Sequence, residues 1–190
     1  MAKKLAIVNQ KGGVGKSTTA VNLGASLAEM GISVLLVDID PQGNASSGVG
    51  IDKSKLEYSI YDVLIDGISI EDAVITTNID NFDILPSNID LAGAEIELVS
   101  MISRESKLKR VIDIVDEKYE YIIYDCPPSL GLLTLNALTA ADGILVPIQC
   151  EYYALEGLAA LMNTVQQIQE TVNPNLEIEG ILRTMYDPRN

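Results

Sequence analysis

The residues with the clearest chemical meaning stand at positions 10–18, where glycines and two lysines precede a serine and a threonine. Glycines allow successive backbone N–H groups to turn inward around an anion, which then lies at the positive end of the following helix. In such a loop Lys16 reaches the β- and γ-phosphates of a nucleotide and Ser17 binds Mg²⁺. The predicted nucleotide-binding residues are Lys11, Gly12, Gly13, Val14, Gly15, Lys16, Ser17 and Thr18.

This loop departs from the usual phosphate-binding pattern at one position. Gln10 stands where that pattern has its first glycine, and Lys11 adds a lysine that the loop itself does not need. Lys11 is therefore able to point away from its own phosphates. A plain glycine turn and a dinucleotide loop are the alternatives, but the latter would need glycine at Thr18 and has no use for Lys16. The pattern favours a nucleoside triphosphate.

Carboxylates follow two apolar runs that are typical of buried parallel strands. Asp38 and Asp40 come after residues 34–37, and Asp125 ends the run 121–124. The carboxyl ends of such strands form the edge of the sheet that binds ligands, and the phosphate loop lies at the same edge. We expect Asp125 to reach the Mg²⁺ of a bound nucleotide. The Asp38 and Asp40 pair also suits a turn before Pro-Gln-Gly, although the nearby loop favours a functional role.

The order of the predicted elements indicates the fold class. Strand patterns alternate with helical spacing along most of the chain, while residues 46–50 are predicted to be a flexible loop. Predicted helices span about 17–30, 91–100, 108–115, 132–140 and 155–169, and predicted strands span about 34–37, 82–85, 121–125, 144–147 and 178–184. We predict an α/β three-layer sandwich, with a mostly parallel sheet and helices on both faces, as in P-loop NTPases.

Length and composition limit the remaining possibilities. The 190 residues suffice for one well-buried domain, and a net charge of −14 excludes a protein that wraps nucleic acid with its whole surface. Cys126 and Cys150 stand far apart in apolar surroundings, which suits a reducing, cytoplasmic compartment, and no run has membrane-spanning length. Because the sequence stops just beyond a predicted core strand, we expect residues 1–190 to be a single P-loop ATPase domain that lacks its C-terminal elements.

Several stretches together resemble the deviant Walker ATPases, and within them the chain is most similar to the ParA/Soj chromosome-partition proteins. Three motifs carry the resemblance in order along the chain: Lys11–Thr18, Asp38–Asn44 and Asp125–Gly131. The stretches Leu85–Glu95 and Cys150–Gly157 are similar to the same subgroup.

The resemblance implies an ATP-dependent homodimer in which two subunits face each other across two nucleotides. Lys11 would then reach the ATP phosphates of the other subunit, in the manner of an arginine finger. Asp40 would position or deprotonate the attacking water. Asp38 and Asp125 would hold Mg²⁺ together with Ser17.

The resemblance also implies partners and a location. The ATP-bound dimer of the family binds DNA without sequence preference on the nucleoid, and a ParB-type centromere-binding protein stimulates its slow hydrolysis. Arg189 matches a DNA-contacting position of the Soj subgroup, although an ordinary exposed arginine is the alternative. Because Arg183 and Arg189 are the only basic residues after position 118, any DNA contact must be local.

Three related functions remain as alternatives. A MinD-like membrane-associated cell-division ATPase would need a C-terminal amphipathic helix, and residues beyond Asn190 would decide between the two. A nitrogenase-type iron protein would need cysteines that bridge a dimer, which Cys126 and Cys150 do not resemble. An ATP-dependent metabolic synthetase shares the fold, but nothing in the sequence indicates a pocket for a small acid.

Overall fold

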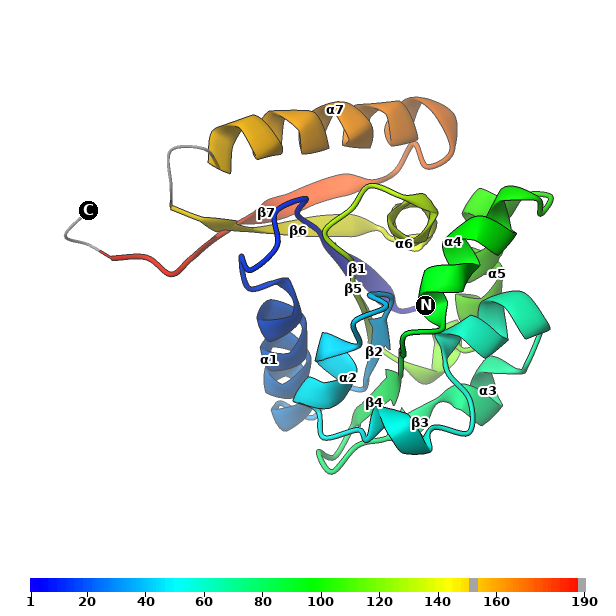
Figure 1. The fold of residues 1–190 in the computed structure, drawn as a ribbon. Coiled ribbons are helices and arrows are strands. Elements are labelled where there is room, and N and C mark those ends of the chain that lie inside the picture. The colour runs from blue at the N-terminus through cyan, green and yellow to red at the C-terminus, as the bar shows by residue number, and fades with distance from the viewer. Residues whose placement is uncertain (151–153, 188–190) are drawn as a thin grey trace.

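The computed structural model describes residues 1–150 and 154–187 and contains a seven-stranded sheet in the order β3-β4-β2-β5-β1-β6-β7 (Figure 1). All neighbouring strands are parallel except the antiparallel pair β3 and β4. The strands are β1 (Lys3–Ile7), β2 (Val34–Asp38), β3 (Ile75–Thr76), β4 (Phe82–Leu85), β5 (Tyr121–Asp125), β6 (Gly143–Gln149) and β7 (Glu177–Thr184).

Helices cover both faces of this sheet, which confirms the predicted three-layer α/β sandwich (Figure 1). On one face α1 packs through Ala20 and Ala28 against Ile7, Leu36 and Ile123. The larger core lies on the other face, beneath α3 to α7. The helices are α1 (Lys16–Glu29), α2 (Asn44–Gly48), α3 (Ile70–Ala73), α4 (Leu91–Val99), α5 (Lys107–Ile112), α6 (Leu132–Ala140) and α7 (Ala154–Thr171).

The register of the central strands brings the predicted site residues to one edge. Asp38 at the end of β2 pairs with Asp125 at the end of β5, and Asp125 also pairs with Ile7 at the end of β1. The phosphate loop begins directly after β1, so it lies at the same carboxyl edge as both carboxylates. This is the arrangement expected of a doubly wound parallel sheet.

The prediction of a flexible loop at residues 46–50 is wrong for residues 46–48, whereas residues 49 and 50 form a turn. Residues Asn44–Gly48 form α2, and the Ser46 side chain is completely buried. Small polar residues favour turns in isolation, but here the helix is fixed by tertiary contacts, because Ser46 donates hydrogen bonds to Asp38 through both its backbone N–H and its hydroxyl.

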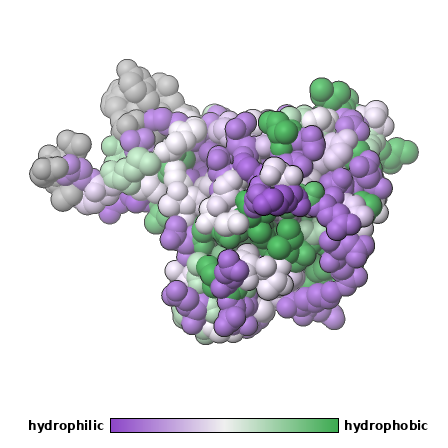
Figure 2. Space-filling model, turned by 60° about the horizontal axis from the view of Figure 1, so that its bottom comes forward, coloured by the Kyte–Doolittle hydropathy of each residue, from purple (hydrophilic) through white to green (hydrophobic). Residues whose placement is uncertain are grey.

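The face seen in Figure 2 is mostly hydrophilic, with apolar residues visible between the polar ones. None of the helices in the described part of the chain has the length and apolar character needed to cross a membrane.

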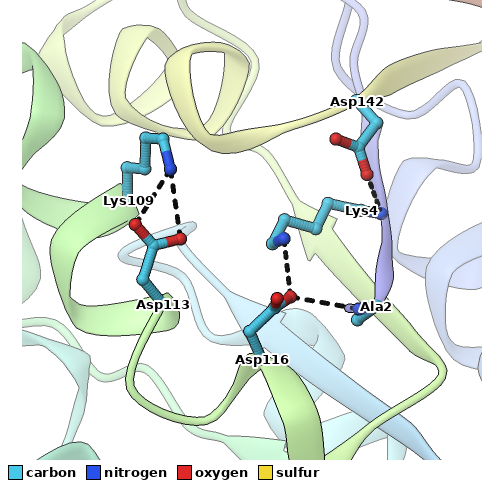
Figure 3. Close-up of polar contacts among 6 residues, drawn as sticks. All are labelled: Ala2, Lys4, Lys109, Asp113, Asp116 and Asp142. Atoms are coloured by element: carbon cyan, nitrogen blue, oxygen red, sulfur yellow. Dashed lines mark hydrogen bonds and ion pairs between the residues drawn. The ribbon is translucent and has the colours of Figure 1, made fainter.

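A buried ion pair fixes the opposite end of the sheet, where the strands begin (Figure 3). Lys4 Nζ lies 2.6 Å from Asp116 Oδ1, and both side chains are less than a tenth exposed. The same Asp116 oxygen accepts the backbone N–H of Ala2 at 3.1 Å, and Asp142 accepts the backbone N–H of Lys4 at 2.8 Å. These contacts tie the start of β1 to two segments that are more than 110 residues away in sequence.

Asp116→Ala tests this tie, because it would leave the Lys4 ammonium buried without its carboxylate. We expect a loss of about 3 to 5 kcal/mol in the free energy of unfolding, measured by denaturant titration. Asp113→Ala is the matched control, since its ion pair with Lys109 is about half exposed and should contribute less than about 1 kcal/mol. Equal losses in the two variants would contradict this assignment.

Candidate nucleotide site

The phosphate loop connects β1 to α1 and is shaped by glycines. Gly13 and Gly15 have φ angles of 73° and 89°, in the left-handed region that favours glycine. Helix α1 begins directly afterwards at Lys16, with no side chain capping its first N–H groups. Those groups are therefore available to an anion placed at the positive end of the helix.

Lys16 lies inside the loop and is 7% exposed. Its ammonium donates to the backbone carbonyl of Lys11 at 3.1 Å, so the side chain of Lys16 folds back onto the phosphate loop. Burial lowers the pKa of Lys16, against the attraction of Asp125 and Asp40, which favours the charged form. The geometry places a cation where the predicted phosphates would lie.

Asp125 is completely buried at the end of β5, and neither of its carboxylate oxygens accepts a hydrogen bond of good geometry. Burial raises its pKa to about 7, and repulsion from Asp38 acts in the same direction. A contact with the Ser17 hydroxyl and the positive charge of Lys16 both favour the ionised form of Asp125 and lower its pKa. A buried carboxylate with two uncompensated oxygens beside a serine fits a divalent cation such as Mg²⁺.

Asp38 is also completely buried but differs from Asp125, because both of its carboxylate oxygens accept hydrogen bonds from nearby residues. Ser46 donates to Asp38 Oδ2 through its N–H at 2.8 Å and its hydroxyl at 2.7 Å, and the N–H of Asp40 donates to Oδ1 at 3.2 Å. Burial raises the pKa of Asp38 to about 6, although the bonds from Ser46 oppose this. The part of Asp38 in holding Mg²⁺ stays a prediction.

Asp40 is 6% exposed and belongs to a cleft of about 380 Å³. The backbone N–H of Gln42 donates to Asp40 Oδ1 at 2.9 Å, which orients the carboxylate. The cleft is lined by Gly12, Gly13, Gly15, Lys16, Ser17, Thr18, Asp40, Gln42, Asn44, Pro128 and Met185. The structure thus brings the loop, Asp40 and the segment after β5 around one space.

Of the remaining predicted residues, Lys11 lies at the exposed outer side of the loop, and its backbone N–H donates to Asn9 Oδ1 at 2.9 Å. Its contact with a second subunit stays a prediction. Arg189 lies outside the described residues, as does part of the stretch Cys150–Gly157.

Two supporting residues were missed by the sequence analysis. Asn9 donates from its side chain to the carbonyl of Pro147 at 2.7 Å, which ties the start of the loop to β6. Thr184, at the end of β7, donates its hydroxyl to the carbonyl of Val14 at 2.8 Å. Thr184 stands 170 residues after its partner, so no local pattern reveals the contact.

The cysteines play no visible part in the cleft. Cys126 is a buried free thiol, and burial raises its pKa well above the ordinary value, whereas Cys150 is exposed. Within residues 1–150 and 154–187, no group of three or more His, Cys, Asp and Glu side chains is arranged to hold a metal ion by itself. A cation at Asp125 would therefore need oxygens from Ser17 and from a bound phosphate.

Comparison with known proteins agrees with this geometry. The family AAA_31, described as an AAA domain, matches residues 2–178. The chain is 60% identical over 189 residues to the sporulation initiation inhibitor protein Soj of Bacillus subtilis, covering all of this chain and 75% of that protein. It is 49% identical to the chromosome partitioning protein ParA of Caulobacter vibrioides, covering 98% of this chain and 70% of that protein. The chain belongs to the ParA/Soj family.

Solved structures of similar proteins hold the cofactors expected of the family. A protein from Mycobacterium smegmatis described as cobyrinic acid a,c-diamide synthase, with bound ADP and magnesium, is 45% identical with a TM-score of 0.96. The match covers all of this chain and 77% of that one. A plasmid partition protein from Borrelia burgdorferi is 29% identical with a TM-score of 0.86, covering all of this chain and 83% of that one.

The pKa of Asp125 leads to a prediction for the protein without nucleotide or metal. Asp125 ionises near pH 4 in the unfolded chain but near pH 7 in the fold, so the fold holds more protons between these values and loses stability as the pH rises. Asp125→Asn lacks this ionisation. At pH 8 we expect it to be more stable than the unsubstituted protein by up to about 4 kcal/mol.

The gain should shrink as the pH falls and should be near zero at pH 4. Thermal unfolding of both proteins in a chelating buffer at a series of pH values measures it. A difference that does not change with pH would mean that Asp125 is not a strained carboxylate.

Proposed function

We propose that this protein is an ATP-dependent, dimerising ATPase of chromosome or plasmid partition, and that residues 1–190 act as a single domain. The observation that carries this proposal is the uncompensated carboxylate of Asp125 beside Lys16 and Ser17, at the sheet edge from which the glycine loop begins. Membership of the ParA/Soj family, with its P-loop ATPase fold, supports the same conclusion.

In the proposed site each residue has a separate task. Lys16 binds the β- and γ-phosphates of ATP, and the N–H groups at the start of α1 bind their oxygens. Ser17, Asp38 and Asp125 would hold Mg²⁺. When bound, Mg²⁺ neutralises charge on the phosphate oxygens.

Asp40 orients the attacking water and accepts its proton. The water oxygen bonds to the γ-phosphorus while the bond from that phosphorus to the β–γ bridging oxygen breaks, which yields ADP and phosphate. The hydrogen bond from Gln42 keeps Asp40 in position for this step. We propose that unstimulated turnover is slow.

Lys11 would complete the site of a second subunit. It lies on the exposed side of the loop, whereas Lys16 is buried within it, so the two lysines have different targets. Two subunits that each contribute Lys11 to the site of the other would bury two nucleotides between them. The dimer would therefore depend on ATP. A ParB-type protein that adjusts this interface would stimulate hydrolysis.

DNA binding has to overcome a net charge of −14. We propose that only the ATP-bound dimer binds, since dimerisation combines the few basic residues of both subunits, and that Arg189 is one of the residues that contact DNA. Such binding is independent of sequence and would place the protein on the nucleoid.

An ATP-dependent synthetase is the second candidate, because the related Mycobacterium smegmatis structure carries the name of a cobyrinic acid diamide synthase. ATP turnover measured separately with cobyrinic acid, with duplex DNA and with a ParB-type protein decides between the two. Turnover that depends on the acid would overturn the partition function.

Lys16→Ala should abolish ATP binding, because the phosphates lose their buried cation. Lys11→Ala should keep ATP affinity within about twofold but lose the ATP-dependent dimer and hydrolysis. Equilibrium titration with a fluorescent ATP analogue and light scattering measure both properties. A Lys11→Ala protein that dimerises and turns over normally would refute the cross-subunit role.

Asp40→Ala should bind ATP and Mg²⁺ but stall before hydrolysis, so that the dimer accumulates. Single-turnover measurements should give a rate at least about a hundredfold below that of the unsubstituted protein. Asp125→Ala should instead weaken Mg²⁺-dependent binding, and identical defects in the two variants would contradict this division.

Fluorescence anisotropy with random duplexes tests the DNA proposal. Affinity should require ATP and fall steeply with salt, with a slope near −0.9 for each phosphate contact. Arg189→Ala should lower both affinity and slope and leave ATPase activity without DNA unchanged. Binding that ignores salt or depends on sequence would be inconsistent with this proposal.

A further inference from the structure

The loop that carries Asp40 is held from outside the cleft by contacts that neither the motifs nor the proposed mechanism includes. Within the loop, the backbone N–H of Gly43 donates to the carbonyl of Asp40 at 2.8 Å, so residues 40–43 form a closed turn. The N–H of Gln42 donates to the Asp40 carboxylate in the same turn. The position of Asp40 therefore depends on where Gln42 and Gly43 lie.

Lys53 contacts this turn from one side. It belongs to the short helical turn Lys53–Lys55, and its ammonium donates to the carbonyl of Gln42 at 2.5 Å. A charged donor makes a stronger hydrogen bond than a neutral one, and because this bond is exposed to solvent it restrains the carbonyl modestly. Lys53 does not line the nucleotide cleft, and it acts on Asp40 only through the backbone of the turn.

Ser87 also contacts the turn, at Gly43. A Cβ placed on Gly43 would lie 2.6 Å from Lys53 Cδ and 2.7 Å from the carbonyl oxygen of Ser87. Gly43 also has a φ of 58°, so glycine is required there both by its conformation and by the space between the two neighbours. The N–H of Ser87 donates to the hydroxyl of Ser46, which in turn donates to Asp38.

We propose that Lys53 is a positioning residue for ATP hydrolysis, which holds the Asp40–Gly43 turn through the carbonyl of Gln42 so that Asp40 meets the attacking water. This inference rests on the proposed ATPase function. Displacement of a catalytic group by about 1 Å can cost about a hundredfold in rate, whereas the phosphate loop that binds ATP is held separately by Asn9 and Thr184. Loss of Lys53 should therefore slow hydrolysis without weakening binding.

Lys53→Met keeps the length of the side chain and removes its charge and its hydrogen bonds. We expect the single-turnover rate to fall about tenfold while the affinity for a non-hydrolysable ATP analogue stays within about twofold. Lys53→Arg should restore most of the rate. Lys55→Met is the matched control, because Lys55 is 80% exposed and pairs only at the surface with Asp52 at 3.0 Å.

Hydrogen exchange of the nucleotide-free protein tests the same contact without ATP. Peptides that cover residues 40–44 should exchange faster in Lys53→Met than in Lys55→Met, with no change in peptides of the phosphate loop. Equal exchange and equal rates in the two variants would overturn the inference, as would equal losses of rate and affinity in Lys53→Met. If the unsubstituted protein does not hydrolyse ATP, the proposed function fails, and the exchange experiment still decides what Lys53 does to the turn.

Discussion

The site depends on negative charge that is buried at the ends of two adjacent strands. Because β2 and β5 pair in register, Asp38 and Asp125 are forced together in the core, and burial raises their pKa values to about 6 and 7. The hydrogen bonds from Ser46 compensate Asp38, whereas Asp125 has no comparable partner. The fold thus compensates the carboxylate of Asp38 with hydrogen bonds and leaves that of Asp125 to be compensated by a cation. This difference is a physical basis for coupling metal binding to the stability of the fold.

Buried charged residues lie at both ends of the sheet, and the two ends differ in whether those charges are paired. Where the strands begin, Lys4 and Asp116 satisfy each other in a buried pair, and this end of the sheet is fixed. Where the strands end, Asp125 is buried near Lys16, and neither of its carboxylate oxygens has a hydrogen-bond partner. Unsatisfied buried groups cost stability, so a protein keeps them where a ligand completes them.

The two sides of the cleft are supported by different contacts. Asn9 and Thr184 tie the phosphate loop to β6 and to the end of β7, while Ser87 and Lys53 both contact the turn that follows Asp40. Binding of phosphates and orientation of the water therefore rest on separate parts of the fold. Substitutions on one side are expected to leave the other side largely intact.

The sequence by itself determined the sandwich architecture and most of the site, because glycine spacing, apolar runs and the carboxylates that end them are local patterns with one common structural solution. It predicted the Lys16 loop, Asp40 and Asp125 in this way. Only the tertiary structure decided that Asn44–Gly48 is a helix, that Ser46 satisfies Asp38, and that Thr184 and Lys53 support the two loops. These contacts join segments that the chain order keeps apart, so their energy depends on strand register and packing, which no local pattern encodes.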